Sequence, residues 1–270
     1  MFDSHAHYDH KRFDFGREEL LEKMHEEGLE YCLNAAIGFE SNEKMMKLLG
    51  KYPWVFFAVG IHPNAVEEDE ENDEIYQEKL NLLTEHKQVR AIGETGLDYY
   101  RLEQVENIEQ MKARQKKWFQ ISLKLAKEKN LPVVLHIRGD ADKDALKILD
   151  TYGYEGMQGV VHCFTGGYDL AMEYIKRGFL IGIGGMITRD EMEELREAVK
   201  KLPMEKILLE TDSPYVRPQG MAGKRNTSES LRVIVKKIAE LTSMSESEIE
   251  KVTDENSKNM FKVLSDEKMC

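Results

Sequence analysis

Two histidines close to the amino terminus, His5 and His7, are separated by one alanine at the end of an apolar run. Side chains two positions apart on a β-strand project to the same face of a sheet, so both imidazoles would point the same way. Imidazole is a common ligand of zinc and related divalent ions. Further residues of metal-binding types each lie late in an apolar run of their own: Glu94, His136, His162 and Asp212. Together these residues predict a metal site built from several strand ends.

The elements that must position these side chains alternate regularly along the chain. Short apolar runs predict strands near 2–5, 31–36, 55–61, 89–94, 133–137, 159–163, 179–183 and 207–211. Segments of helical periodicity lie between and after them, at 17–27, 41–51, 74–86, 107–129, 142–151, 168–177, 189–201 and 228–242. Strands that alternate with helices form right-handed βαβ units and a parallel sheet. The pattern therefore predicts a (β/α)8 TIM barrel. An open doubly wound sheet is the alternative, but it would not bring all of these strand ends to one centre.

A further amphipathic segment, 246–263, follows the last of these helices. Ser245 precedes it and Glu248 lies three residues later, which is the spacing of a capping box. We therefore expect an additional C-terminal helix packed on the barrel wall. No linker rich in proline, glycine or serine divides the chain, so residues 1–270 are expected to form a single domain.

The composition limits the classes of partner. With 50 Asp and Glu against 38 Lys and Arg, the net charge is −12, so the chain as a whole does not attract membranes or nucleic acid. No apolar stretch approaches the roughly 20 residues of a membrane span, and the first residues lack the features of a signal peptide. The three cysteines are far apart, which disfavours a disulfide framework. These features favour a cytoplasmic protein; the sequence does not define the oligomeric state, and a monomer is compatible with it.

The predicted ligand set is larger than one tetrahedral ion needs. Four imidazoles and two carboxylates favour two divalent ions, because a carboxylate can bridge two ions and an imidazole cannot. Two ions roughly 3.5–4 Å apart would lower the pKa of a water between them and neutralise charge on a transferring oxygen group. Asp212 has the chemistry to bind one ion while it accepts the proton of that water. Nitrogen-rich ligation favours Zn, Mn, Ni or Fe on affinity, whereas nucleases often use the abundant Mg.

Strand periodicity places two more polar side chains on the inner face. Arg138 and Glu210 each lie two residues from a predicted ligand and share its face. Arg138 could bind a phosphate through two parallel hydrogen bonds, or it could form an internal salt bridge with Glu210. Cys163 follows a predicted ligand directly and is expected to face the helices. His62 is expected to contact substrate rather than a metal, because its loop leads away through Pro63.

Charged segments flank the predicted site. Basic residues follow the eighth strand or lie on neighbouring loops, and they would supply local positive charge to the same rim: Arg101, Arg189, Arg217, Lys224 and Arg225. The alternative is a scatter of surface cations. The acidic run 67–74 is expected to be a solvated loop that leads into a helix. Because it follows the third strand, it could also repel a polyanion from that side.

The motifs that carry these residues resemble those of the TatD family of metal-dependent hydrolases, a branch of the amidohydrolase-like metallo-barrels. They occur in the order DSHAHYD (3–9), GIHP (60–63), AIGETGLDYY (91–100), LPVVLHIR (131–138), VVHCFTGG (160–167), IGIGG (181–185), LLETDSPY (208–215) and GKRN (223–226). The resemblance covers nearly the whole chain. It departs from the family in that the usual GKRNxP segment reads GKRNTS and the 67–74 run is unusually acidic.

The resemblance implies a (β/α)8 barrel with divalent-metal-dependent deoxyribonuclease activity. It also implies a 3′–5′ exonuclease of single-stranded DNA, with suggested roles in DNA repair and DNA breakdown. On the family pattern, one ion would be bound by His5, His7 and Asp212. The second would be bound by His136 and His162, and Glu94 would bridge the two. The residues expected to contact the substrate are His62, Arg138, Glu210, Lys224 and Arg225.

Two other functions remain compatible with the sequence. The same pair of ions could act on a carbonyl group, which would make the protein a hydrolase of a C–N, carboxylic ester or aminoacyl bond. A metal-stabilised binding protein without turnover is the third class. Several arginines near the predicted site favour a phosphate substrate over both.

Overall fold

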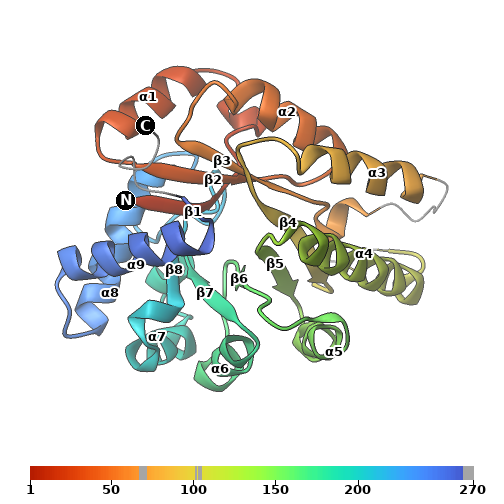
Figure 1. Ribbon diagram of the computed structural model, residues 1–270. Coiled ribbons are helices and arrows are strands. Elements are labelled where there is room, and N and C mark those ends of the chain that lie inside the picture. Colours follow the sequence, from red (N-terminus) through yellow and green to blue (C-terminus); the bar gives the residue numbers. More distant parts are fainter. Residues whose placement is uncertain (67–71, 101, 103–104, 264–270) are drawn as a thin grey trace.

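The computed structural model describes residues 1–66, 72–100, 102 and 105–263 (Figure 1). Eight parallel strands form one sheet in which each strand pairs with the next in the chain. They are β1 (Phe2–Ala6), β2 (Tyr31–Ala35), β3 (Val55–Val59), β4 (Val89–Asp98), β5 (Val133–Arg138), β6 (Gly159–Val161), β7 (Phe179–Ile183) and β8 (Ile207–Leu209). The predicted (β/α)8 barrel is confirmed.

Closure of the barrel occurs just beyond the end of β8. Ala6 forms an isolated parallel bridge with Ser213. The backbone N–H of His7 donates to Ser213 O at 2.7 Å, and that of Asp212 donates to His5 O at 2.9 Å. Three predicted ligands are therefore held by the same backbone contacts that join the first strand to the last.

Helices surround the strands (Figure 1). They are α1 (Arg17–Glu26), α2 (Phe39–Leu49), α3 (Asp73–Leu83), α4 (Ile108–Lys129), α5 (Asp142–Tyr152), α6 (Tyr168–Lys176), α7 (Glu193–Lys201), α8 (Leu231–Leu241) and α9 (Glu246–Met260). Short 3-10 turns lie in the connections: η1 (Lys11–Phe13), η2 (Pro63–Ala65), η4 (Gly185–Thr188), η5 (Met204–Lys206) and η6 (Ser228–Ser230). Within the described ranges, every helix is too short or too polar to cross a bilayer.

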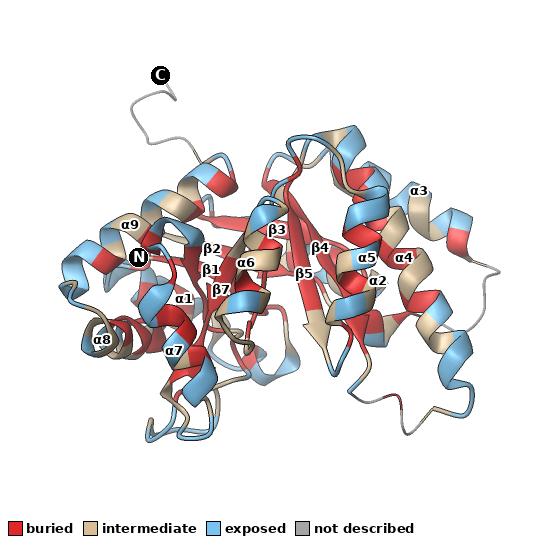
Figure 2. Ribbon diagram, turned by 90° about the horizontal axis from the view of Figure 1, so that it is seen from below, coloured by how far each residue is buried: buried red, intermediate tan, exposed pale blue. Residues whose placement is uncertain are grey.

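Two apolar layers hold the barrel together. The larger layer lies between the strands and the helices, and the smaller fills the barrel interior with side chains such as Phe2, Leu33 and Val134. Figure 2 shows the buried strands between helices whose outer sides are exposed. In that view α9 lies at one end of the strands, and the tip of β5 points to the other.

The additional helix α9 closes the floor of the barrel. Its capping box, Ser245 with Glu248, is present as predicted. It packs on α8 and on the starts of β1 and β8. Phe261 and Met260 join the inner apolar layer, and the ring of Phe261 lies 5.8 Å from that of Phe2. The helix thus seals the end of the barrel opposite the predicted site as well as covering part of its wall.

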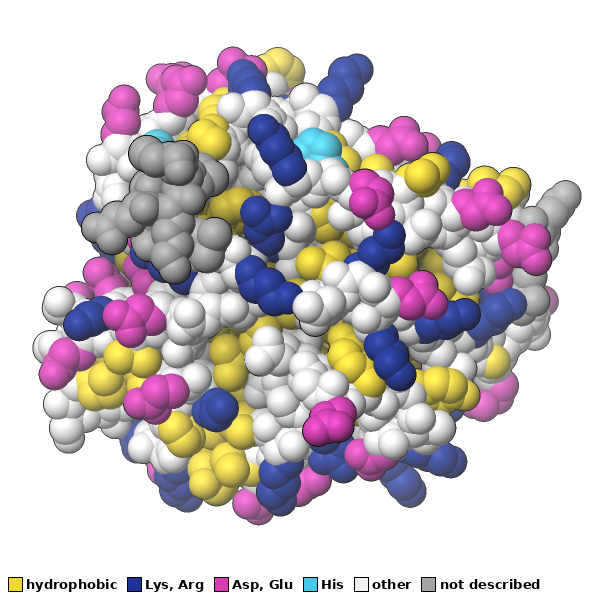
Figure 3. All heavy atoms as spheres, in the orientation of Figure 1, with side chains coloured by type: hydrophobic (Ala, Val, Ile, Leu, Met, Phe, Trp, Pro, Cys, Tyr) yellow, Lys and Arg dark blue, Asp and Glu magenta, His cyan; other side chains and the backbone are white. Residues whose placement is uncertain are grey.

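Figure 3 shows this floor, where Lys and Arg side chains lie across the middle and Asp and Glu mostly around the edge. The helices run antiparallel to the strands, so their carboxyl ends lie on this face. Basic residues occupy the last turns of α4 and α7, at Lys127, Lys129, Lys200 and Lys201. Because a helix carboxyl end carries partial negative charge, these lysines stabilise the helices.

We expect Phe261→Ala to lower the free energy of unfolding by about 3–5 kcal/mol, because it leaves a cavity under the barrel interior. Chemical denaturation followed by circular dichroism measures the change. Lys251→Ala, on the exposed side of α9, is the control and should change stability by less than about 0.5 kcal/mol. Equal stability of the two variants would show that Phe261 does not close the core.

Candidate metal centre

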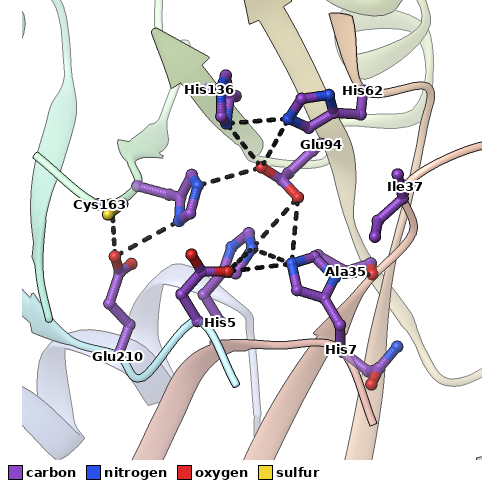
Figure 4. Close-up of polar contacts among 12 residues, drawn as sticks. His5, His7, Ala35, Ile37, His62, Glu94, His136, Cys163 and Glu210 are labelled. Carbon is purple, nitrogen blue, oxygen red and sulfur yellow. Dashed lines mark hydrogen bonds and ion pairs between the residues drawn. The ribbon is translucent and has the colours of Figure 1, made fainter. Parts of the chain in front are cut away.

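All six predicted ligands meet at the carboxyl ends of the strands. His5 lies in β1, Glu94 in β4 and His136 in β5. The other three, His7, His162 and Asp212, follow the ends of β1, β6 and β8 directly or within three residues. Glu94 occupies the middle of the cluster, with His62 and His136 on one side and His5 and His7 on the other (Figure 4).

The carboxylate of Glu94 lies between two pairs of histidines. Its Oε2 is 3.4 Å from Nε2 of both His5 and His7. Its Oε1 is 3.1 Å from His136 Nδ1 and 3.1 Å from His162 Nε2. Burial raises the pKa of this carboxyl, but the surrounding histidines lower it well below its usual value. Glu94 therefore presents one anionic oxygen to each pair.

Asp212 completes the first pair. Its Oδ1 lies 3.2 Å from His7 Nε2 and 4.0 Å from His5 Nε2. His5, His7 and Asp212 each offer one atom to a group within 4.8 Å, and so do His5, Glu94 and His162. Such groups have the size and the donor types of divalent-metal sites.

Outer hydrogen bonds orient the ligand nitrogens toward the centre. His7 Nδ1 donates to Ala35 O at 2.8 Å, and His136 Nε2 donates to Asp98 Oδ2 at 3.2 Å. Glu210 Oε1 lies 3.4 Å from His162 Nδ1. A proton held on the outer nitrogen leaves the lone pair of the inner nitrogen free for a metal. The donor set therefore fits divalent ions in chemistry as well as in position.

Asp98 is a functional candidate that the sequence reasoning missed. Besides His136, it accepts hydrogen bonds from Asn64 Nδ2 at 2.7 Å and from the backbone of Tyr100 at 3.0 Å. Burial raises its pKa, but the hydrogen bond and charge of His136 together with the bonds from Asn64 and Tyr100 lower it to about 2. Its spacing from Glu94 could have identified it in the sequence. Asp98 lies four residues after Glu94 and therefore on the same face of β4.

His62 also lies at the second histidine pair, but its ring has the opposite orientation. Its Nδ1 accepts a hydrogen bond from the backbone N–H of Asn64 at 3.0 Å. The proton of the neutral ring is therefore on Nε2, which lies 3.2 Å from His136 Nδ1 and 3.9 Å from Glu94 Oε1. Burial and the neighbouring His136 lower the pKa of His62 to about 3. This imidazole offers the centre a hydrogen-bond donor and no lone pair.

Glu210 is fully buried beneath His162. Its Oε1 accepts a hydrogen bond from the backbone N–H of Cys163. A Cβ at Gly182 would lie 2.4 Å from Glu210 Oε2, so glycine in the IGIGG motif makes room for this carboxylate. The position of Glu210 does not fit the predicted contact with a substrate and instead indicates that it orients His162.

Arg138 and Cys163 contact each other. Arg138 Nη2 donates to Cys163 Sγ at 2.9 Å, and no described carboxylate lies within ion-pair distance of Arg138. The predicted salt bridge with Glu210 is therefore not formed. The prediction that Cys163 faces the helices is wrong, because β6 ends at Val161 and Cys163 has a φ of +48°. Strand alternation does not extend to a residue in that conformation.

The basic residues after β8 have different surroundings. Lys224 is exposed and lines a hollow on the rim. Arg225 donates to Arg12 O at 2.7 Å, and its guanidinium lies 5.0 Å from the centre of the Phe13 ring. Arg225 thus joins two loops, whereas Lys224 is available to a ligand. Arg101 lies outside the described residues.

The acidic run 67–74 is described only from residue 72 onward. Asp73 in this run accepts hydrogen bonds from Arg114 Nη1 and Nη2 at 2.7 and 2.8 Å. Its carboxylate therefore joins the start of α3 to α4. The predicted effect of residues 67–71 on a polyanion lies outside the described part of the chain.

Comparisons with known proteins match the whole length of the chain. The family model described as "TatD related DNase" matches residues 2–262. The uncharacterized metal-dependent hydrolase YabD of Bacillus subtilis is 34% identical and covers 97% of this chain and 99% of its own. An enzyme of Cronobacter sakazakii, named 3′-5′ ssDNA/RNA exonuclease TatD, is 33% identical and covers 97% of both.

A solved structure supports the same relationship. The crystal structure of the TatD homologue YjjV from Escherichia coli has a TM-score of 0.87 and 28% identity, and covers 98% of both chains. The family that the sequence motifs predicted is therefore confirmed. This chain belongs to the TatD family of metal-dependent hydrolases.

Proposed function

We propose that this protein is a phosphodiesterase that removes nucleotides from the 3′ end of single-stranded DNA with two divalent ions. The observation that supports this most directly is the central carboxylate of Glu94, which directs one oxygen to each histidine pair. One ion would be held by His5, His7 and Asp212, and the other by His136 and His162. Held by these residues, two ions would lower the pKa of a bound water and would neutralise negative charge on the reacting phosphate.

Three residues of the centre have separate roles in the proposed reaction. Asp212, with a side chain 14% exposed, is the most accessible of the six predicted ligands and accepts a proton from water at its carboxylate. The Nε2–H of His62 donates to an oxygen on which negative charge develops. Arg138 binds a phosphate oxygen, because a charge-assisted bond to phosphate is stronger than its present bond to a neutral thiol.

The depth of the centre favours a single strand over a duplex. The side chains of the predicted ligands are at most 14% exposed, so a scissile bond must enter a recess. A flexible strand end can do so, whereas a paired end must first separate. The Cronobacter relative carries the name of a ssDNA/RNA exonuclease, which is consistent with this substrate class.

The proposal is tested by elemental analysis together with degradation of end-labelled DNA. We expect two metal equivalents per chain and stepwise shortening of a single strand labelled at its 5′ end. A chelator should stop the reaction, and Zn, Mn, Mg or Ni added back should restore it. Hydrolysis of a lactone, an amide or aminoacyl-tRNA without hydrolysis of DNA would overturn the proposal. Metal-loaded protein inactive on every substrate would indicate a binding protein instead.

Lys224 and Arg225 should respond differently to substitution. We expect Lys224→Ala to raise KM for DNA and to flatten its dependence on salt, because fewer counterions are displaced. Arg225→Ala should also lower the free energy of unfolding, since it removes the contact between the loops of residues 12 and 225. Steady-state kinetics at several salt concentrations and chemical denaturation separate the two effects. An unchanged salt dependence in Lys224→Ala would exclude its contact with the strand.

A further inference from the structure

We propose that a hollow beside the metal centre binds the next internucleotide phosphate of the strand, on the 5′ side of the scissile bond. This inference rests on the proposed function. The hollow, called here the β8 hollow, has a volume of about 420 Å³. The residues of its lining that could contact nucleic acid are Arg12, Arg189, Tyr215, Arg217 and Lys224.

The β8 hollow lies next to the metal centre. Tyr215 lines it, and the ring of Tyr215 lies 6.0 Å from the ring of His7 and 5.5 Å from the ring of His10. The backbone N–H of Tyr215 donates to Asp212 O at 2.7 Å. Because Tyr215 neighbours His7 and also lines the hollow, a strand that leaves the centre past this ring would enter the hollow.

The charge of the hollow is unusual for this chain. Its described lining contains four cations and no Asp or Glu. None of the four has a described carboxylate within ion-pair distance, although acidic residues outnumber basic ones by 50 to 38 in the sequence. Asp190, next to the lining residue Arg189, is already bound by Gln219 Nε2 at 2.8 Å. In addition, Arg189 Nε is buried and has no hydrogen-bond partner among the described residues. An anionic ligand would satisfy this group of cations.

Contacts between three rim segments hold the cations in place. The backbone N–H of Gln219 donates to Thr188 Oγ1 at 2.8 Å, which joins the segment after β7 to the segment after β8. Arg225 joins the latter to Arg12. A Cβ at Gly185 would lie 2.1 Å from Val216 O, so glycine is required where these segments approach each other. The hollow is therefore a built feature of the rim.

The aromatic ring and the adjoining surface suit a nucleic acid strand. The guanidinium of Arg12 lies over the ring of Tyr215, 5.6 Å from its centre, but the side chain is still 36% exposed, so a base can stack on the exposed part of the ring. Arg12 and Lys224 also line a second hollow of about 690 Å³, together with Arg225. A 3′–5′ exonuclease must let the 5′ remainder of its substrate leave the centre. The one acidic side chain in the described lining of the second hollow, Glu229, is paired with Lys23. The two hollows, which share Arg12 and Lys224, therefore provide a positively charged path for this remainder.

The test uses the double variant Arg12→Gln/Arg217→Gln and a matched control, Lys236→Gln/Lys251→Gln. Both pairs lose two positive charges, and the control lysines are exposed on α8 and α9. Binding of a fluorescent single-stranded octanucleotide is measured by anisotropy in the presence of a chelator, at several salt concentrations. We expect the double variant to bind roughly tenfold more weakly and the slope of log Kd against log salt to fall by about 1.4. The control should match the wild-type protein.

Kinetics separate this proposal from the proposed function. With metal present, the loss of kcat/KM in the double variant should be larger for the octanucleotide than for a dinucleotide, which has a single internucleotide phosphate. A double variant that matches the control in both assays would overturn the β8 hollow while DNA hydrolysis by the wild type stands. Wild-type protein that binds the octanucleotide through these arginines but hydrolyses no phosphodiester would support the hollow and overturn the proposed function. Wild-type protein that does not bind the octanucleotide would overturn the hollow.

Discussion

Glu94→Gln is expected to abolish hydrolysis and to release metal from the protein. Glutamine has the shape of glutamate, but it is neutral and one of its two terminal atoms is an N–H donor that cannot ligate a metal. In either orientation of the amide, one of the two histidine pairs would face the NH2 group of the glutamine instead of a carboxylate oxygen. Because water activation depends on both ions in the proposed mechanism, we expect kcat to fall by about 10³-fold or more.

Elemental analysis after gel filtration, together with kcat for a single strand, measures both effects. Circular dichroism should show a folded barrel, since the apolar layers do not include Glu94. Glu240→Gln, at an exposed position of α8, is the control and should retain metal and activity. Two retained metal equivalents together with normal turnover in Glu94→Gln would contradict the assignment of Glu94 as the shared ligand.

The convergence of the proposed ligands could be predicted because it follows a simple rule of the fold. Parallel strands of a barrel end on one rim, so polar residues late in separate apolar runs must lie near each other. His5 and Glu94, far apart in the sequence, come within 3.4 Å in this way. The rule needs only the order of the strands, which the alternation of strands and helices supplied.

Asp98 was missed because glycines obscured the length of β4. Gly93 and Gly96 lower the strand propensity of this segment, and the prediction ended the strand at Glu94. In the structure Gly96 pairs with His136, and a Cβ there would lie 2.2 Å from His136 O. Glycine is therefore required for close pairing with β5. Tertiary pairing overrides propensity here, which a single sequence does not reveal.

Side chains beyond the strand ends were also hard to place. Alternation predicted an outward Cys163, but that residue follows the end of β6 with a left-handed backbone. Sequence analysis did not single out Arg12, because its proposed role depends on Tyr215, Arg217 and Lys224, which lie about 200 residues away in the chain. Charge is visible in a sequence, whereas the partner of a charge is not. The sequence shows the charge of Arg225, for example, but not its hydrogen bond to Arg12 O, which joins two loops.

His62→Ala is expected to lower kcat for DNA by about 10²–10³-fold while both metal equivalents remain bound, because the variant loses a donor to the developing charge and no ligand. Asn64 donates to Nδ1 of the native ring, which keeps the proton on Nε2 and excludes that nitrogen as a ligand.

His136→Ala is the matched comparison, since it removes a predicted ligand from the same side of Glu94 and should lose metal as well as activity. His62→Gln retains an N–H donor and should recover part of kcat. Metal content and kcat, measured on the same preparations, distinguish a hydrogen-bond donor from a metal ligand at position 62. If His62→Ala lost metal to the same extent as His136→Ala, His62 would be a ligand and the assigned position of its proton would be wrong.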